Sequence, residues 1–474
     1  MSLEETALHY LSEQTSLLIS LAKDIWDHPE VALQETYASK QITDQLEKGG
    51  FSLKRGVAQM PTAFIASWGE GKPIIGILGE YDALPDLSQK VSSEKEPVIK
   101  GGPGHGCGHN LLGVGSLGAT LAVKEAMQKH NIKGTIKYYG CPAEETLVGK
   151  VFLARDGVFD DLDAALTWHP WYTNSVWWAS SNAMNSFKIN FHGIAAHAGD
   201  APEAGRSALD AVVLTDVAVN YLREHIIQEA RIHCVITNGG SVPNVVPSYA
   251  QIWYYVRAPL RDQVEHIYQR VLDIAKGAAL MTGTTSDVEL ITGCYNYLQN
   301  VVIGELMTEK MKKLGPPPFT DEDRVFARQL IATLKPGEVE KALGHFELTR
   351  EEAGDLCDKI FDEVGGLGKK GGVIGGSTEV GDVSQITPTG QVNTCCKPLG
   401  IAQHSWQNTG ASGSGIGFKG MMLAAKVLAL TALDLMRKKD VLEAAQNEFK
   451  SVTGGKEKYK TALPEGAAVP NIGT

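Results

Sequence analysis

Apolar and polar positions divide the chain into stretches with different periodicities. Between residues 4 and 49 the apolar residues recur with helical spacing, and this spacing breaks near His28 and Pro29. Short β-rich runs then alternate with helical segments up to about residue 182. Strands that alternate with helices predict a mixed, partly parallel sheet with helices on both faces. The expected strands are residues 63–68, 74–78, 134–139 and 164–168, and the expected helix covers residues 112–130.

The periodicity changes at about residue 183, where a second pattern begins. Four expected strands and two expected helices follow one another in the order β-α-β-β-α-β. This order is the ferredoxin-like unit, which is complete in itself and therefore predicts a small α+β domain inserted into the larger one. The expected strands are residues 185–191, 231–237, 250–257 and 287–292, and the expected helices are residues 207–225 and 263–280.

After residue 299 the pattern is helical and charged as far as residue 365, and a glycine-rich stretch follows up to residue 376. A long apolar helix is expected at residues 417–436, before a polar tail. The predicted fold class is therefore α/β. A mixed-sheet domain with helices on both faces is made of residues 1–182 and 299–474, and an inserted ferredoxin-like α+β domain, residues 183–298, interrupts it.

The composition narrows the class of protein. The 474 residues carry a formal net charge of −11 and no run of Lys or Arg, which argues against a nucleic-acid or anionic-membrane partner. The N-terminus lacks the pattern of a secretory signal, and the longest apolar stretch, residues 421–436, has the pattern of a buried amphipathic helix. Seven scattered cysteines do not suggest a disulfide framework, so we expect a cytoplasmic protein.

The densest cluster of chemistry-bearing residues is GHGCGHN, residues 104–110. Cys107 and His109 stand two apart among glycines that let the backbone bend tightly. Thiolate and imidazole are good ligands for zinc-like ions. The alternative is a flexible turn with an incidental cysteine, and from this motif alone the two interpretations carry similar weight.

Three further motifs lie near the ends of expected strands or before a helix. CPAEE places Glu144 beside Glu145, so that a metal can hold one carboxylate while the other acts as a base. His169 in WHP directly follows an expected strand, and His404 in QHSW precedes the last long helix. Taken singly, each motif is more often a solvated acidic turn or a structural histidine. Together with Cys107 they supply enough ligands for two metals that share one of them and leave room for water.

Four segments of the chain resemble the motifs of the dinuclear metallo-amidohydrolases. They are HGCGHN, PAEE, WHP and HGIAAHAGDAPEAGRSALDA (residues 192–211), and they follow the order of that family, which contains aminoacylases, glutamate carboxypeptidases and hydrolases of indole-acetyl amino acids. GEYDALP, GSTEVGDVS and QHSWQ (residues 79–85, 376–384 and 403–407) resemble more narrowly the branch of p-aminobenzoyl-glutamate hydrolases and related dipeptidases. The resemblance covers essentially the whole chain.

This resemblance implies a metal centre and a catalytic base in the larger domain. Cys107 would bridge two divalent metal ions, and Glu144 would be the general base that carries a proton from water to the leaving amine. The implied metals are zinc or manganese, with cobalt as a third candidate. The remaining implied ligands are His109, Glu145, His169 and His404.

The resemblance also gives the inserted domain a role as a lid and dimerisation domain. It implies that His197 reaches the oxyanion of the tetrahedral intermediate, often from the partner subunit of a dimer. Asn244 and Arg257 match positions that hold the carboxylate of the substrate, for which the two-pronged guanidinium is suited. Without the resemblance, a strand-edge histidine, a turn asparagine and a surface arginine are the simpler interpretations.

Three residues depart from the pattern of the wider family. GEYDALP offers Glu80 and Asp82 where many members have a histidine ligand, and Asn110 stands where many have aspartate. We therefore expect all three to lie outside the set of metal ligands, with Asp82 orienting His109 as a hydrogen-bond acceptor. The departures leave the identity of the metal open.

The function that the sequence predicts is hydrolysis of an amide bond with release of an amino acid. The favoured substrate is p-aminobenzoyl-glutamate or a similar N-acyl or N-aroyl amino acid, and a dipeptidase or a general N-acyl-amino-acid hydrolase is the alternative enzyme. The alternative of another class is a catalytically silent relative that binds a small molecule, although none of the expected metal-coordinating residues is missing. A structural zinc site fails because the ligands span about 300 residues. The expected assembly is a homodimer, with a second, related subunit as an alternative.

Overall fold

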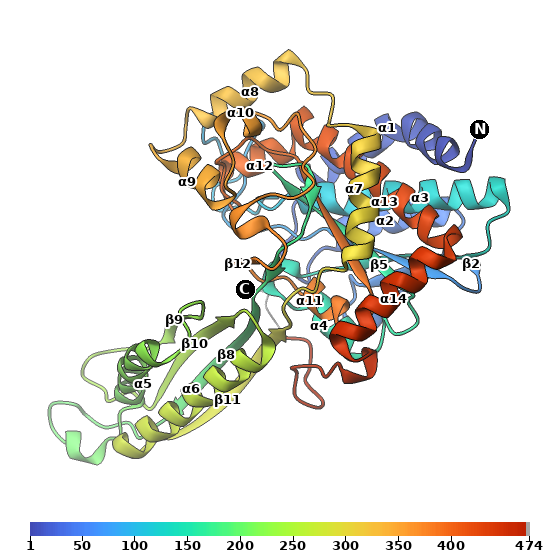
Figure 1. Ribbon diagram of the computed structural model, residues 1–474. Helices are drawn as coiled ribbons and strands as arrows, with labels where there is room; N and C mark the ends of the chain where they lie inside the picture. Colours follow the sequence, from blue (N-terminus) through green and yellow to red (C-terminus); the bar gives the residue numbers. More distant parts are fainter. Residues whose placement is uncertain (471–474) are drawn as a thin grey trace.

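A computed structural model describes residues 1–470, and the last four residues of the predicted segment 299–474 lie outside that part (Figure 1). The chain opens with two helices, α1 (Leu3–Asp27) and α2 (Thr36–Lys48). Ser2 caps α1, because its hydroxyl accepts from the backbone N–H of Glu5 while the Glu5 carboxylate accepts from the backbone N–H of Ser2. The predicted break near Pro29 lies between the two helices, since proline lacks the N–H that a helix interior needs.

The main sheet is mixed, with the strand order β1-β2-β4-β3-β5-β13-β6. Strands β3, β4, β5 and β13 pair in parallel, whereas β1, β2 and β6 pair antiparallel with their neighbours. The carboxyl ends of the four parallel strands therefore meet at one edge of the sheet. The strands are β1 (Ser52–Arg55), β2 (Phe64–Glu70), β3 (Ile74–Glu80), β4 (Gly134–Cys141), β5 (Ala164–Trp171), β6 (Ser175–Val176) and β13 (Thr389–Cys395).

Helices cover both faces of this sheet, which confirms the predicted fold class. One core packs between the sheet and α1, α3, α7 and α13, and it contains Ile77 of β3. A second core lies on the opposite face with α4 and α11, and it contains Leu78. Ile77 and Leu78 face opposite cores because successive side chains of a strand alternate. The helices are α3 (His109–His130), α4 (Gly149–Arg155), α7 (Val301–Leu314), α11 (Val380–Ser384) and α13 (Gly415–Arg437).

Helix α13 is a core helix of this domain. It is long and apolar enough to cross a membrane, but 83% of its apolar window is buried inside the protein. It packs against α1, α3 and α7, so neighbouring helices cover its apolar surface. This burial agrees with the helix predicted at residues 417–436.

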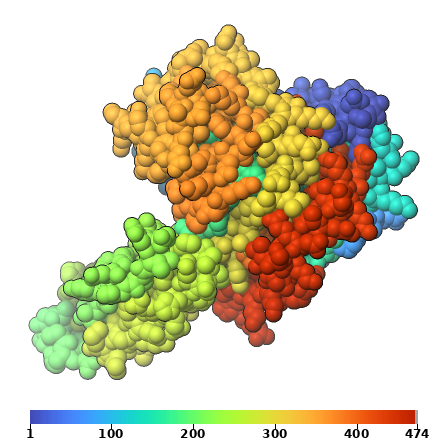
Figure 2. Space-filling model, viewed as in Figure 1, coloured from blue at the N-terminus to red at the C-terminus, as the bar shows by residue number. Residues whose placement is uncertain are grey.

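The inserted segment forms an arm that projects away from the main domain (Figures 1 and 2). Its antiparallel sheet has the order β11-β8-β10-β9, and α5 and α6 pack against it around a separate apolar core. This is the predicted β-α-β-β-α-β order. The elements are β8 (Ala183–His192), α5 (Ala208–Leu222), β9 (Arg231–Asn238), β10 (Tyr249–Ala258), α6 (Arg261–Thr282) and β11 (Thr285–Cys294).

The second part of the large domain adds smaller elements around the sheet. The predicted helical, charged stretch after residue 299 folds into α7 and three shorter helices. The remaining elements are β7 (Ser180–Ser181), α8 (Asp321–Ile331), α9 (Glu338–His345), α10 (Arg350–Ala353), β12 (Val373–Ile374), α12 (Trp406–Ser412) and α14 (Lys439–Thr453).

Strand β13 was not expected from the sequence, although every one of its residues is buried. Its sequence, TGQVNTC, has no alternation of apolar and polar residues, and Val392 is its one large aliphatic side chain. It is a strand because β5 on one side and β6 on the other satisfy its backbone groups. Strand β5 also continues beyond its predicted end at residue 168, so His169 lies within the strand.

Candidate active site

The candidate site residues lie where the parallel strands end. Glu80 is the last residue of β3, Glu144 and Glu145 follow β4, and His169 is near the end of β5. Cys107 lies in the loop just before α3, His109 is the first residue of α3, and His404 lies in the loop between β13 and α12. The register of the parallel sheet, rather than the spacing of the motifs, brings these segments together.

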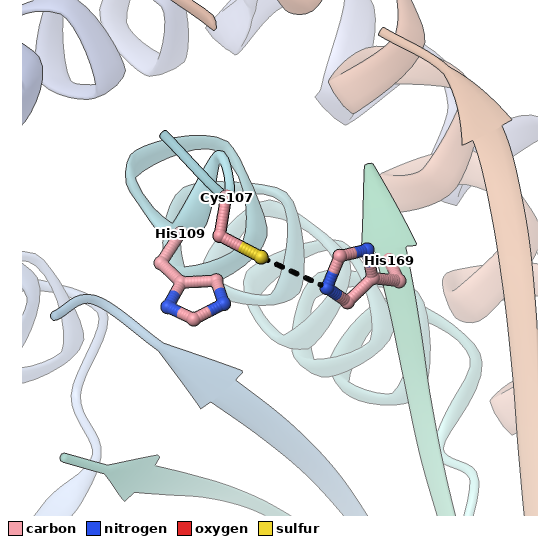
Figure 3. A group of neighbouring side chains, drawn as sticks. All are labelled: Cys107, His109 and His169. Atoms are coloured by element: carbon pink, nitrogen blue, oxygen red, sulfur yellow. Dashed lines mark hydrogen bonds between the residues drawn. The ribbon is translucent and has the colours of Figure 1, made fainter. Parts of the chain in front are cut away.

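Cys107 lies between two histidines whose free nitrogens face it (Figure 3). Its Sγ is 3.5 Å from His169 Nε2, and one atom from each of Cys107, His109 and His169 lies within 4.8 Å of the others. The Nδ1 of His169 donates to the Pro170 carbonyl at 2.9 Å, and the Nδ1 of His109 donates to Asp82 Oδ1 at 2.8 Å. Because Nδ1 is engaged in both rings, Nε2 is the nitrogen that each histidine presents to Cys107.

The thiol of Cys107 also belongs to a second group of donors, with Glu145 and His404. The Nε2 of His404 lies 3.2 Å from Glu145 Oε2. The backbone of His404 has a φ of 58°, in the left-handed region, and its N–H donates to the Gly106 carbonyl at 3.0 Å. The loop thus holds His404 against the Cys107 turn at the cost of local strain. Two groups of donors that share a single thiol are the arrangement that a bridging ligand requires.

A buried lysine and two further carboxylates stand beside this cluster, and sequence reasoning missed the lysine. Lys150 is fully buried, with its Nζ 2.8 Å from Glu80 Oε1 and 3.1 Å from Glu379 Oε1. The other oxygen of Glu80 lies 3.4 Å from His109 Nε2. Sequence reasoning placed Glu80 outside the ligand set. In the structure Glu80 Oε1 pairs with Lys150, whereas Oε2 lies near His109 Nε2 without a hydrogen bond to it. Lys150 stands in α4 outside any motif, so no local pattern pointed to it.

The combined effect of burial and neighbouring charges lowers the pKa of one residue of the cluster, Cys107, and raises the pKa of another, Glu144. Burial raises the pKa of the Cys107 thiol, but the imidazoles of His109 and His169 outweigh it and hold that pKa well below its usual range. Burial, together with Glu80 and Glu379, raises the pKa of Glu144. The site therefore favours a thiolate, the form that binds metals, and a carboxyl that holds a proton readily.

Several polar atoms of the cluster have no hydrogen-bond partner among residues 1–470. They include His109 Nε2 and Glu145 Oε1, both buried. Buried polar atoms are rarely left unpaired, because each loses its water without a replacement. Here the unpaired atoms are an imidazole nitrogen and a carboxylate oxygen beside a thiolate, and all three of these donors suit a divalent cation.

The cluster opens into a cavity of about 330 Å³ between the main sheet and the arm. Cys107, Glu144 and His404 line it on the side of the cluster, and Arg257 of β10 lines it on the side of the arm. The guanidinium of Arg257 donates to Ser377 Oγ at 2.7 Å. Arg257 is therefore placed to meet an anionic part of a ligand that reaches the cluster.

The other two predicted lid residues lie away from this cavity in the same chain. His197 and Asn244 adjoin one another on the arm, where the backbone N–H of Ala198 donates to the Asn244 carbonyl at 3.0 Å. The Nδ1 of His197 accepts from the backbone N–H groups of Gly199 and Asp200, so its Nε2 carries the proton. Neither side chain lines the cavity of its own chain. The Nε2–H of His197 is thus available to donate a hydrogen bond to a group outside its own chain's cavity.

Asn110, the third departure from the family pattern, has a structural place. Its Nδ2 donates to the carbonyls of Ala22 and Ser412, both at 3.1 Å, and the side chain is fully buried. These bonds tie α3 to α1 and α12. Asn110 is therefore engaged away from the donor atoms of Cys107 and His109.

Comparison with known proteins places the chain among hydrolases. The family model for the peptidase dimerisation domain matches residues 181–281. The chain is 41% identical over 453 residues to one of the subunits of the p-aminobenzoyl-glutamate hydrolase of Escherichia coli (strain K12), with 94% of each chain covered. It is 30% identical over 461 residues to the Xaa-Arg dipeptidase of Mus musculus, with 94% of this chain and 92% of that protein covered.

A solved structure shares the fold. It is the crystal structure of a Bacillus subtilis protein, a dinuclear metal binding peptidase from the M20 family. The comparison gives a TM-score of 0.59 and 16% sequence identity. The match covers 90% of this chain and 99% of that one. At this identity the likeness shows the fold alone, including the inserted domain.

Proposed function

The chain belongs to the M20 family of amide-bond hydrolases and peptidases, and from this premise we propose that its cluster binds two divalent cations and hydrolyses an N-acyl or N-aroyl amino acid. The favoured substrate is p-aminobenzoyl-glutamate. The observation that carries the proposal is that the Cys107 thiol belongs to two separate groups of donor atoms, one with His109 and His169 and the other with Glu145 and His404. The relative with 41% identity, which is named for that substrate, supports the choice of acyl group.

The residues present fit such a pair of cations. Cys107 would be the shared ligand, because its thiolate is stabilised and lies within reach of both groups. The unpaired Nε2 of His109 and the unpaired Oε1 of Glu145 would gain the partner that they lack among the described residues. Zinc or manganese suits this mixture of thiolate, imidazole and carboxylate, with cobalt as a third candidate. The proposed ligands are Cys107, His109, Glu145, His169 and His404.

The reaction then follows from the residues around the cavity. The bound cations would supply Lewis acidity, which lowers the pKa of a water molecule and polarises the amide carbonyl. Glu144, on the cavity wall, takes a proton from the attacking water and returns it to the nitrogen of the leaving amino acid. Its buried position beside Glu80 and Glu379 favours holding that proton between the two steps. Arg257 holds the carboxylate of the released amino acid.

Residues of the lid complete this proposal in a dimer. Because His197 and Asn244 do not line the cavity of their own chain, we propose that they serve the site of a partner chain. His197 would donate its Nε2–H to the oxyanion and Asn244 would assist Arg257. Apolar side chains exposed on α5 and β9 of the arm support a contact between two chains. They are Val213, Val217, Tyr221, Val235 and Ile236.

The partner chain is proposed to be a second copy, with a related subunit as the second candidate. The family model that matches the arm describes a dimerisation domain. The E. coli relative is itself named as one subunit of its hydrolase, which supports a two-subunit enzyme. Light scattering of the purified chain, alone and after addition of a related subunit, separates the two candidates. A monomer in both measurements would contradict the lid's proposed role.

The experiment that tests the function combines elemental analysis with an activity panel. We expect about two divalent cations per chain. We also expect chelator-sensitive hydrolysis of p-aminobenzoyl-glutamate that zinc, manganese or cobalt restores. Faster hydrolysis of dipeptides would move the assignment to the Xaa-Arg dipeptidase type, the second candidate function, which the 30% identity to that enzyme supports. Bound cations without cleavage of any panel member would contradict the proposed substrate, and absence of both would contradict the centre.

A further inference from the structure

The cavity wall next to His169 carries polar side chains that the proposed reaction does not use. In β5 the residues Thr167, His169 and Trp171 point to the same side of the sheet, because side chains alternate along a strand. Strand β13 lies beside β5 in parallel, with Gln391 opposite Thr167. Thr167, Trp171 and Gln391 all line the cavity that holds Cys107 and Glu144.

Two of these side chains are buried and unpaired. Thr167 is 1% exposed and Gln391 is 3% exposed, and neither Thr167 Oγ1 nor Gln391 Oε1 has a hydrogen-bond partner among the described residues. A buried acceptor without a partner costs stability, so two of them side by side indicate a group that is absent from the protein alone. A hydroxyl and an amide oxygen placed next to each other can together accept two N–H bonds from one amino group.

Aromatic rings flank this polar pair. The ring centroids of Trp171 and Trp177 are 5.7 Å apart at an angle of 56°, and the ring of His169 is 5.9 Å from that of Trp177 in an edge-on arrangement. Both tryptophans line the same cavity. Ring faces and edges in this arrangement favour a flat, aromatic guest over an aliphatic one.

We propose that Thr167 and Gln391 form the floor of a subsite for the acyl half of the substrate, which takes an aromatic acyl group with an amino substituent on its far edge. The amino group donates one N–H to Thr167 Oγ1 and the other to Gln391 Oε1, and the ring lies against Trp171 and Trp177. The inference rests on the proposed function, because it places the acyl side of the same amide whose amino acid side meets Arg257. His169, the next residue after Thr167 on the same side of β5, is a proposed cation ligand, so the reacting carbonyl would lie beside it.

The test compares two substrates that differ only in the amino group. We measure kcat/KM for p-aminobenzoyl-glutamate and for benzoyl-glutamate, and take their ratio as the preference. The wild type is expected to prefer the amino compound by about tenfold or more. Benzoyl-glutamate has no amino group, so Thr167 Oγ1 and Gln391 Oε1 stay unpaired when it binds. Thr167→Val and Gln391→Met are each expected to lower the preference several-fold, and the double variant is expected to bring it close to one.

Two matched variants separate this role from a general effect on the fold. Thr431→Val removes another buried hydroxyl that has no partner among the described residues, but Thr431 lies in α13 and does not line the cavity. Its preference is expected to equal that of the wild type. Thr167→Ser keeps the hydroxyl and is expected to retain the preference. An unchanged preference in Thr167→Val and Gln391→Met, or its loss in Thr431→Val, would overturn the subsite.

A binding measurement keeps the inference distinct from the proposed function. Calorimetry with 4-aminobenzamide and with benzamide, which lack the amino acid half, is expected to show tighter binding of the amino compound by the wild type and equal binding by the double variant. Equal binding by the wild type overturns the subsite, even if p-aminobenzoyl-glutamate is hydrolysed. Tighter binding without hydrolysis supports the subsite and contradicts the proposed substrate. Thermal unfolding of each variant shows whether it is folded, and calorimetry of the wild type does not depend on any variant.

Discussion

Asp82 orients His109 from the side of the ring opposite Nε2. His109 Nδ1 donates to Asp82 Oδ1 at 2.8 Å, and both side chains are fully buried. The second oxygen of Asp82 accepts from the backbone N–H of Glu145 at 2.9 Å. One carboxylate thus fixes the tautomer of one proposed ligand and the backbone of another. Neither bond depends on a cation, so the donor atoms are arranged before a cation binds.

The first prediction concerns this carboxylate. Asp82→Asn is expected to lower the affinity for divalent cations by about 10- to 100-fold, because the orientation and basicity of His109 are no longer fixed. Competition with a chromophoric chelator measures the affinity. Asp86→Asn, in the same loop but exposed, is the control and is expected to bind like the wild type. Equal affinity in the Asp82 variant would contradict the orienting role.

The second prediction separates the base from the ligands. Glu144→Ala is expected to lower kcat by about 10²- to 10⁴-fold while the cation content stays unchanged, because Glu144 moves the proton without being needed to bind the cations. Cys107→Ala and His404→Ala are expected to lower the cation content. Elemental analysis and steady-state kinetics on the same preparations give both values. Loss of cations in Glu144→Ala, or near-normal turnover, would show that the roles are assigned wrongly.

The third prediction tests whether His197 acts across a dimer. His197→Ala is expected to lower the rate by about 10²- to 10³-fold with little change in cation content, because it removes one oxyanion donor. Mixing it with Glu144→Ala, after dissociation and reassembly, is expected to restore about a quarter of the activity, since half of the dimers are hybrids with one complete site. No recovery on mixing would place His197 in its own chain's site or outside catalysis.

The fourth prediction concerns the buried ion pairs of Lys150. Lys150→Met is expected to lower the free energy of unfolding by about 3–5 kcal/mol, because the carboxylates of Glu80 and Glu379 then remain buried without the ammonium group of Lys150. The double variant Lys150→Met/Glu379→Gln is expected to recover part of that loss. Urea unfolding in the absence of divalent cations measures the free energy of unfolding of the wild type, the single variant and the double variant.

An ion pair whose lysine is exposed serves as the control for Lys150. The side chain of Lys72 is 66% exposed and lies 2.6 Å from Asp163, and Lys72→Met is expected to cost only about 0–1 kcal/mol. Equal losses in the two variants would mean that burial of the Lys150 pairs has no energetic consequence.

The fifth prediction concerns the dependence of stability on pH. Burial, and then the nearby His109, lower the pKa of His105 from 6.5 to about 4. A depressed folded pKa stabilises the fold above pH 6.5, and that stability is lost as the pH falls towards 4. Between pH 7 and pH 5 the wild type is therefore expected to lose about 2 kcal/mol more than His105→Gln, which cannot titrate.

The measurement for His105 is urea unfolding of both proteins at the two pH values in the presence of chelator. The other titrating groups are common to the two proteins, so the difference between them isolates His105. Parallel losses in both proteins would show that His105 is not buried in its neutral form.

The sequence predicted most of the elements and their order, since their signals are local. The helical spacing before residue 49, the strand runs around Ile74 and Ala164, and the β-α-β-β-α-β order of the arm all depend on residues within one element. Strand β13 was missed because its burial depends on β5 and β6, which are distant in sequence. Among its polar side chains, Thr389 donates to the Thr387 carbonyl, and Gln391 lines the cavity, which is formed by segments distant in the sequence.

By itself the sequence determined the fold class, the family resemblance and the donor types, because a thiol, three imidazoles and two adjacent carboxylates are fixed by composition and motif. Only the tertiary structure decided that Cys107 joins two groups of donors, that Lys150 pairs with Glu80, and that Thr167 lies beside Gln391. The physical reason is that these relationships join separate strands and loops. The parallel pairing of the sheet sets their distances, and side-chain periodicity carries no information about which strands become neighbours.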